Sequence, residues 1–161
     1  MNDIYLAALQ LAKEGISVVP VSVDGSKRPA PYTWAKYQEN KPTTDELIDW
    51  FAKGTQQGVG AICGAVSGNL EMLELEGRAV AAQIHIQAKD MAENSGLGDL
   101  WQKIQDGYCE VTPSGGIHWL YRISDGEVPG NTKLARRPGE NGGVDVLCET
   151  RGEGGFVILA P

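Results

Sequence analysis

Basic side chains, cysteines and long apolar runs are all scarce in this sequence, and each shortage excludes a class of protein. The 14 lysines and arginines are outnumbered by 21 aspartates and glutamates, which leaves a net charge of −7. Tight binding to nucleic acid through overall charge is therefore disfavoured, although a local basic groove is compatible with this total. No apolar run reaches the roughly 18 residues that suggest a membrane span. The start, Met1-Asn2-Asp3-Ile4, lacks the basic and apolar stretches of a signal peptide, so we expect a cytoplasmic protein without a membrane partner.

The cysteines, Cys63, Cys109 and Cys148, lie far apart and form no Cys-x-x-Cys pair. This spacing argues against a zinc knuckle and against a disulfide framework. Because free cysteine is among the most buried residue types, the sequence predicts three buried thiols.

Helical patterns dominate the first part of the chain, and short strand patterns dominate the second. Thr43 and Glu46 form a capping-box pattern at the start of one predicted helix. The chain has 161 residues and no linker-like segment, so we expect a single α+β domain over residues 1–161. The strands predicted at 59–66 and 70–76 flank a tight turn and are expected to pair as a hairpin. The predicted helices are 3–13, 43–54, 78–94 and 99–104, and the predicted strands are 17–21, 59–66, 70–76, 108–112, 117–123, 132–135, 144–148 and 156–159.

Two glutamates alternate with leucines in the segment Leu73-Glu74-Leu75-Glu76-Gly77. Alternate residues of a strand share a face, so Leu73 and Leu75 are expected to enter the core while Glu74 and Glu76 project together on the other side. Their spacing of roughly 6.5–7 Å allows both carboxylates to reach a pair of metal ions about 3.5–4 Å apart. A half-buried strand with solvated acids gives the same alternation and is the simpler interpretation of this segment alone.

A glycine-rich turn follows in Thr112-Pro113-Ser114-Gly115-Gly116-Ile117-His118. Gly115 and Gly116 permit close backbone approach, and exposed N–H groups in such a turn can hold a phosphate. Ser114 and His118 are expected to donate further hydrogen bonds to the same phosphates. An ordinary hairpin turn with an incidental histidine is the alternative interpretation.

Asp145 stands between Val144 and Val146 in the next acidic segment. A lone acid on an apolar strand is either solvated or a metal ligand, and both interpretations stay open at this stage. Basic residues near this strand are candidates for binding phosphate, although scattered surface cations are equally ordinary. They are Lys133, Arg136, Arg137 and Arg151.

The order of these segments, rather than any one of them, resembles the archaeo-eukaryotic primase superfamily. More narrowly, it is similar to the primase-polymerase domain at the N-terminus of phage and plasmid replication proteins. The supporting segments include Gly15–Val21, Lys27-Arg28-Pro29 and the closing Arg151–Pro161, so that the resemblance covers nearly the whole chain. The sequence departs from the family at its acidic pair, where the family usually has Asp, or Asp then Glu, and this chain has two glutamates.

The resemblance implies a primase-polymerase fold. In that fold a small helix-on-sheet N-terminal module is joined to an antiparallel sheet that resembles an RNA-recognition motif, with the active site between them. It further implies that the chain is the N-terminal part of a longer replication protein of a prokaryotic host cell, with a helicase domain or subunit as a partner.

The resemblance also implies template-directed nucleotidyl transfer, in which the enzyme makes primers and polymerises DNA on a single-stranded DNA template. Glu74, Glu76 and Asp145 are then the catalytic acids that hold two divalent ions, Mg²⁺ or Mn²⁺. The nucleoside triphosphate is bound by a set that comprises Ser114, Gly115, Gly116, His118, Lys133, Arg136, Arg137 and Arg151.

Two other functions are compatible with the same residues. A non-catalytic nucleic-acid-binding module of a replication protein would explain the glutamate pair and the acidic net charge. A metal-dependent nuclease would also use acids on adjacent strands, but the sequence shows no further His or Glu at a spacing that indicates a general base for water.

Overall fold

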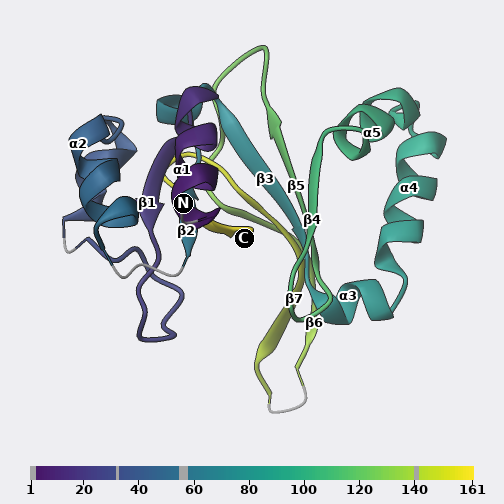
Figure 1. The fold of residues 1–161 in the computed structure, drawn as a ribbon. Helices are drawn as coiled ribbons and strands as arrows, with labels where there is room; N and C mark the ends of the chain where they lie inside the picture. The colour runs from purple at the N-terminus through teal and green to yellow at the C-terminus, as the bar shows by residue number, and fades with distance from the viewer. Residues whose placement is uncertain (1–2, 32, 55–57, 140–141) are drawn as a thin grey trace. The chain divides into compact units, whose positions relative to one another are not determined.

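The computed structural model describes residues 3–31, 33–54, 58–139 and 142–161, which form helices and two antiparallel sheets (Figure 1). The expected α+β class is therefore confirmed. The chain divides into two compact units, and it passes between them several times. Unit 1 comprises the chain up to Leu70 together with Arg122–Gly130 and the segment from Gly152 onward, and unit 2 comprises Glu71–Tyr121 and Asn131–Arg151. None of the helices in the described ranges has both the length and the apolar character needed to cross a membrane.

Unit 1 is a three-stranded sheet with helices packed on it. The strand order is β1-β2-β8, with both pairs antiparallel. A buried cluster of Val19, Tyr37 and Ile62 joins the sheet to the short helical segments. The elements of unit 1 are α1 (Asp3–Lys13), β1 (Ser17–Pro20), a 3₁₀ helix (Trp34–Gln38), α2 (Thr44–Leu47), a π-helical turn (Ile48–Ala52), β2 (Val59–Ile62), a 3₁₀ turn (Ala65–Ser67) and β8 (Phe156–Leu159).

The predicted capping box at α2 is present. The Thr43 side chain accepts a hydrogen bond from the backbone N–H of Glu46, and a Glu46 carboxylate oxygen accepts one from the backbone N–H of Thr43. Glu46 also accepts from the Lys36 ammonium at 2.9 Å and from the Tyr37 hydroxyl at 2.7 Å. The Lys36 contact first, and then the backbone of Thr43, lower the pKa of Glu46 from 4.5 to about 2.

Replacing Glu46 by Gln is expected to lower the free energy of unfolding by about 1 kcal/mol at neutral pH, because Gln keeps the capping box but lacks the negative charge that pairs with the Lys36 ammonium and favours the helix N-terminus. Since the pKa is depressed on folding, this stabilisation is complete above about pH 4.5 and is lost as the pH falls through about 2. Urea unfolding of both proteins between pH 7 and pH 2 measures the difference. Glu39→Gln, at an exposed position, provides the control. If the free energies of unfolding of Glu46→Gln and the wild type differed by the same amount at every pH, the stabilisation would not come from the ionised Glu46 carboxylate.

Unit 2 is a five-stranded sheet with the order β4-β5-β3-β7-β6 and with helices packed on one face. Leu73 and Leu75 on β3 form a core with Trp119 on β5, and Trp101 and Ile104 of α5 pack against that core. The opposite face of the same strands carries the side chains of the candidate site. The elements of unit 2 are β3 (Leu70–Leu75), α3 (Gly77–Ala81), α4 (Ile84–Asn94), α5 (Gly98–Gln105), β4 (Tyr108–Val111), β5 (Ile117–Arg122), β6 (Thr132–Pro138) and β7 (Val144–Arg151).

Two predicted elements were wrong for reasons of tertiary structure. The strands β2 and β3 do not form a hairpin, because Gly64 adopts a φ of +101° and a 3₁₀ turn redirects the chain into another sheet. Gly64, which follows the end of β2, forms an isolated bridge with Leu70 at the start of β3. The helix predicted at 78–94 is interrupted at Gln83, which has a left-handed φ of 59°.

The thiols also differ from expectation. Cys63 is buried as predicted, but Cys109 is exposed on β4 and Cys148 is half-buried. The difference for Cys109 follows from the position of β4 at the edge of its sheet, which the spacing of cysteines along the chain does not reveal.

Candidate active site

A row of charged side chains crosses all five strands of the unit 2 sheet. Glu110 on β4 lies directly opposite His118 on β5, and Glu149 on β7 lies opposite both Glu74 on β3 and Lys133 on β6. Residues directly opposite one another in a ladder share a face. The Nε2 atom of His118 lies 3.3 Å from Oε1 of Glu74, which closes the row between β5 and β3.

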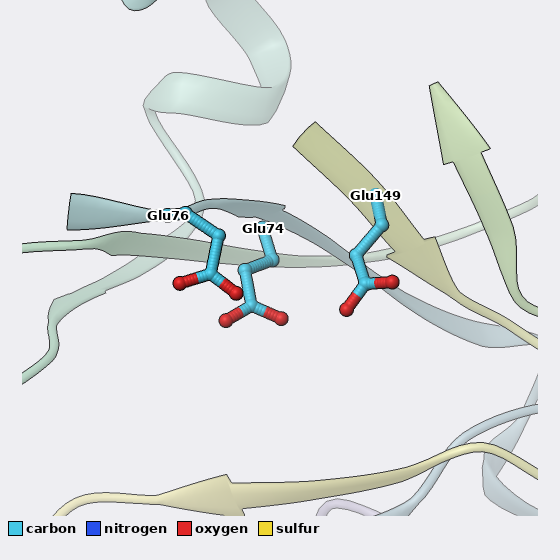
Figure 2. Close-up of side chains that lie close together, drawn as sticks. All are labelled: Glu74, Glu76 and Glu149. Atoms are coloured by element: carbon cyan, nitrogen blue, oxygen red, sulfur yellow. The ribbon is translucent and has the colours of Figure 1, made fainter. Parts of the chain in front are cut away.

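Three carboxylates gather at the centre of this row. One oxygen from each of Glu74, Glu76 and Glu149 lies within 4.8 Å of the other two, and we call these residues the acidic cluster. Figure 2 shows Glu74 and Glu76 leaving one strand and Glu149 leaving its neighbour, with the carboxylates directed to the same side. Such a set of oxygens suits a hard divalent cation such as Mg²⁺ or Mn²⁺.

The predicted alternation on β3 is confirmed. Leu73 and Leu75 are buried in the core, and Glu74 and Glu76 project on the other face. The ladder also holds the backbone beyond the end of β3, because the N–H of Glu76 donates to the carbonyl of Leu147 at 3.0 Å. Both carboxylates of the pair are thus carried by a backbone fixed in the sheet.

Negative charge in the acidic cluster is concentrated and only partly balanced. Burial raises the pKa of Glu149, Arg151 opposes this shift, and the charges of Glu74 and Glu76 add to it. The Arg151 guanidinium donates to Glu149 and lies 4.0 Å from a Glu74 oxygen. A raised carboxyl pKa beside two other acids indicates a site where added positive charge is favourable.

His118 is the second cation against the cluster. Burial by itself would lower its pKa, but hydrogen bonds to Glu110 and Glu74 outweigh burial and raise the pKa to about 9. The ring is therefore protonated at neutral pH. Its side chain is 11 % exposed, which places a nearly buried imidazolium beside the acidic cluster.

The glycine turn between β4 and β5 packs its backbone against the end of β3. A Cβ atom on Gly77 would lie 2.0 Å from the carbonyl oxygen of Ser114, and one on Gly116 would lie 2.7 Å from that of Leu75. Gly115 has a φ of +79° and no neighbouring atom within 4 Å of its Cβ position. The turn is thus held next to the Glu76 backbone while its tip is open to a ligand.

The turn is fixed internally by hydroxyl groups. The Thr112 hydroxyl accepts a hydrogen bond from the N–H of Gly116 at 2.9 Å and lies 3.1 Å from the hydroxyl of Ser114. The predicted set of Ser114, Gly115, Gly116 and His118 is therefore brought together with the acidic pair within unit 2.

Asp145 occupies a different environment from the acidic cluster. Its carboxylate pairs with Arg78 at 2.6 Å and with Arg137 at 3.3 Å, and the Arg78 contact is the main reason that its pKa is lowered. The acid that the structure groups with Glu74 and Glu76 is Glu149.

A β-bulge in β7 explains this exchange of acids. Ala135 pairs with Cys148 and the next residue, Arg136, pairs with Val146, so β7 carries one extra residue, Leu147, and β6 carries one of its own, Leu134, between Lys133 and Ala135. Leu147 and its neighbour Cys148 both contact the same core cluster, as the two residues of a bulge can. An extra residue reverses the alternation of faces, so Asp145 and Glu149 lie on opposite faces although they are four residues apart.

The remaining basic candidates lie along β6 and β7. Lys133 is exposed and faces the same side as Glu149, Arg151 contacts the acidic cluster, Arg136 is exposed at the sheet edge, and Arg137 pairs with Asp145. Lys133 and Arg151 lie on the face of the cluster.

Two residues of the site were missed in the sequence. Glu149 was missed because the strand was expected to end at residue 148, whereas β7 continues to Arg151. The sequence did contain a signal for Glu149. Glu149 and Arg151 are charged residues two positions apart, as Glu74 and Glu76 are, and this spacing places both on one face of a strand. Glu110 had no comparable signal, because only the pairing of β4 with β5 brings it to His118.

The family model described as bifunctional DNA primase/polymerase, N-terminal, matches residues 8–161. No curated protein matches the chain significantly.

Proposed function

Because the chain belongs to the family of bifunctional DNA primase/polymerase N-terminal domains, we propose that it joins nucleotides on a single-stranded DNA template at the acidic cluster. The observation that carries this proposal is the convergence of Glu74, Glu76 and Glu149 within 4.8 Å of one another, on a sheet that also bears the glycine turn. In this proposal Glu149 takes the place that the sequence assigned to Asp145.

The acidic cluster would hold two divalent ions, Mg²⁺ or Mn²⁺. When bound, such ions lower the pKa of the primer 3′-hydroxyl and neutralise the triphosphate and the leaving pyrophosphate. The protein itself fixes the ligands in advance, because Glu74 and Glu149 stand directly opposite each other in the ladder. Glutamate has one more rotatable bond than aspartate, and the rigid sheet limits the freedom that this adds.

The triphosphate is bound by the turn and the cations around it. The Ser114 hydroxyl donates to phosphate oxygens, and His118 adds a charged donor. The N–H groups of Gly115 and Gly116 bond Thr112 inside the turn, so these glycines contribute close backbone approach rather than the free N–H donors expected from the sequence. Arg151 and Lys133 supply positive charge on the same face. Arg136 at the sheet edge is assigned to the template phosphates, and the Asp145 carboxylate orients Arg78 and Arg137. Base pairing with the template selects the nucleotide, so no base-reading side chain is required.

In this proposal unit 1 corresponds to the helix-on-sheet module of the family and unit 2 to the module that resembles an RNA-recognition motif. The position of the active site between two modules stays a prediction, as do a helicase partner, a phage or plasmid origin and a cytoplasmic location. The direct test is primer synthesis on single-stranded DNA with nucleoside triphosphates and Mg²⁺ or Mn²⁺. Labelled DNA incubated with the same ions tests for the cleavage that a nuclease would give.

The non-catalytic alternative rests on the all-glutamate acidic cluster and the net charge of −7. Thermal unfolding with dGTP and Mn²⁺ separates the two functions. For the enzyme we expect a stabilisation of about 2.7 kcal/mol when dGTP is present at 100 times its dissociation constant, and neither component alone should reproduce it. An unchanged melting temperature at all concentrations of dGTP and Mn²⁺ would favour the non-catalytic module.

A further inference from the structure

Glu110 uses both of its carboxylate oxygens inside the protein. Oε1 accepts a hydrogen bond from Nδ1 of His118 at 2.9 Å, and Oε2 accepts one from the hydroxyl of Tyr108 at 2.7 Å. The side chains of Glu110 and His118 are only 12 % and 11 % exposed. A nearly buried acid with both oxygens engaged is fixed in one orientation.

Strand geometry accounts for this arrangement. Glu110 lies directly opposite His118 in the β4–β5 ladder, and Tyr108 is two residues before Glu110 and so lies on the same face. A carboxylate can only accept, so the Nδ1 atom of His118 carries the proton and donates it. With Nδ1 committed to Glu110, the other ring nitrogen, Nε2, is directed to Glu74 at 3.3 Å.

We propose that Glu110 is a positioning residue of the nucleotide site, which holds the His118 ring so that Nε2 is presented to the triphosphate, and that Tyr108 in turn holds Glu110. The inference rests on the proposed function of His118 and deepens it. Carboxylates that orient a histidine in this way at metal centres typically change affinity or activity by 10–100-fold when they are removed. Glu110 itself does not touch the nucleotide in this scheme.

A double-mutant cycle in the full chain tests the proposal by activity. We expect Glu110→Ala to raise the nucleotide KM by roughly tenfold or more with a much smaller change in kcat, and Glu110→Gln to recover most of the affinity because its amide oxygen still accepts from Nδ1. In a His118→Ala background, Glu110→Ala should have no further effect on KM. Equal effects in both backgrounds would overturn the proposal, since Glu110 would then act independently of the ring.

Ring NMR tests the positioning without any reference to activity. The chain has only two histidines, so the His118→Ala spectrum assigns the His118 signals. We expect a slowly exchanging Nδ1 proton on His118 in the wild type that is lost in Glu110→Ala and retained in Glu93→Ala, a change on exposed α4. An unchanged His118 signal in Glu110→Ala would overturn the proposal. If that signal is lost while His118→Ala leaves KM unchanged, the positioning holds and the proposed role of His118 in nucleotide binding fails.

Discussion

Glu149→Gln and Glu74→Gln are each expected to reduce primer synthesis by more than about 100-fold. Loss of a residue that only supports a metal ligand commonly costs 10–100-fold, so loss of a ligand itself should cost more. The glutamine side chain keeps the size of glutamate but removes the negative charge that a divalent ion requires. Synthesis on a single-stranded template, measured across a range of Mn²⁺ and Mg²⁺ concentrations, gives the effect, and the melting temperature of each variant reports whether it is folded.

Asp145→Asn provides the matched comparison, because it makes the same chemical change four residues away on the same strand. Asp145 bonds Arg78 and Arg137, so we expect a loss of less than about tenfold and an unchanged dependence on metal concentration. The reverse result, in which Asp145→Asn abolishes synthesis and Glu149→Gln does not, would restore the metal set expected from the sequence and refute the one proposed from the structure.

Gly77→Ala is expected to damage both the stability of the protein and its use of nucleotides. The new Cβ atom would lie 2.0 Å from the carbonyl oxygen of Ser114, and since this contact is with backbone, the glycine turn has to move. Overpacking of this kind costs about 1–3 kcal/mol, and displacement of a substrate-binding group by about 1 Å can cost about 100-fold in kcat/KM. Urea unfolding and nucleotide titration of primer synthesis measure the two effects.

Gly98→Ala is the control for this substitution. Gly98 begins α5 in the same unit, and its Cβ position meets no atom closer than 3.4 Å, so alanine there should leave stability unchanged or raise it by up to about 1 kcal/mol. A Gly77→Ala protein as stable and active as Gly98→Ala would mean that the turn is not held against β3 as described.

Local patterns predicted much of this molecule because they depend on near neighbours. The capping box of Thr43 and Glu46 needs only four residues, and the alternation around Glu74 and Glu76 needs only a strand. The helix at 3–13 and the strand positions after residue 107 were predicted for the same reason. The family resemblance carried by the order of these segments is confirmed by the family match.

The helix break at Gln83 shows where local patterns fail. Nothing in the run of residues before Ile84 indicates a left-handed residue, yet Gln83 has a φ of 59°. Ile84 packs on the core of the sheet, whereas α4 contains no buried residue. Periodicity alone does not distinguish a helix that leaves the sheet after its first turn from a helix that stays packed on the sheet.

The sequence by itself determined that two glutamates share a strand face and that a glycine turn with a serine and a histidine follows them. Tertiary structure decided which third acid joins the pair, because the extra residue Leu147 in β7 turns Asp145 to the helix-covered face and leaves Glu149 opposite Glu74. It also decided that Glu110 lies against His118. Strand register and bulges depend on packing between segments far apart in the chain, and a shift of one residue exchanges every side chain between the two faces of a sheet.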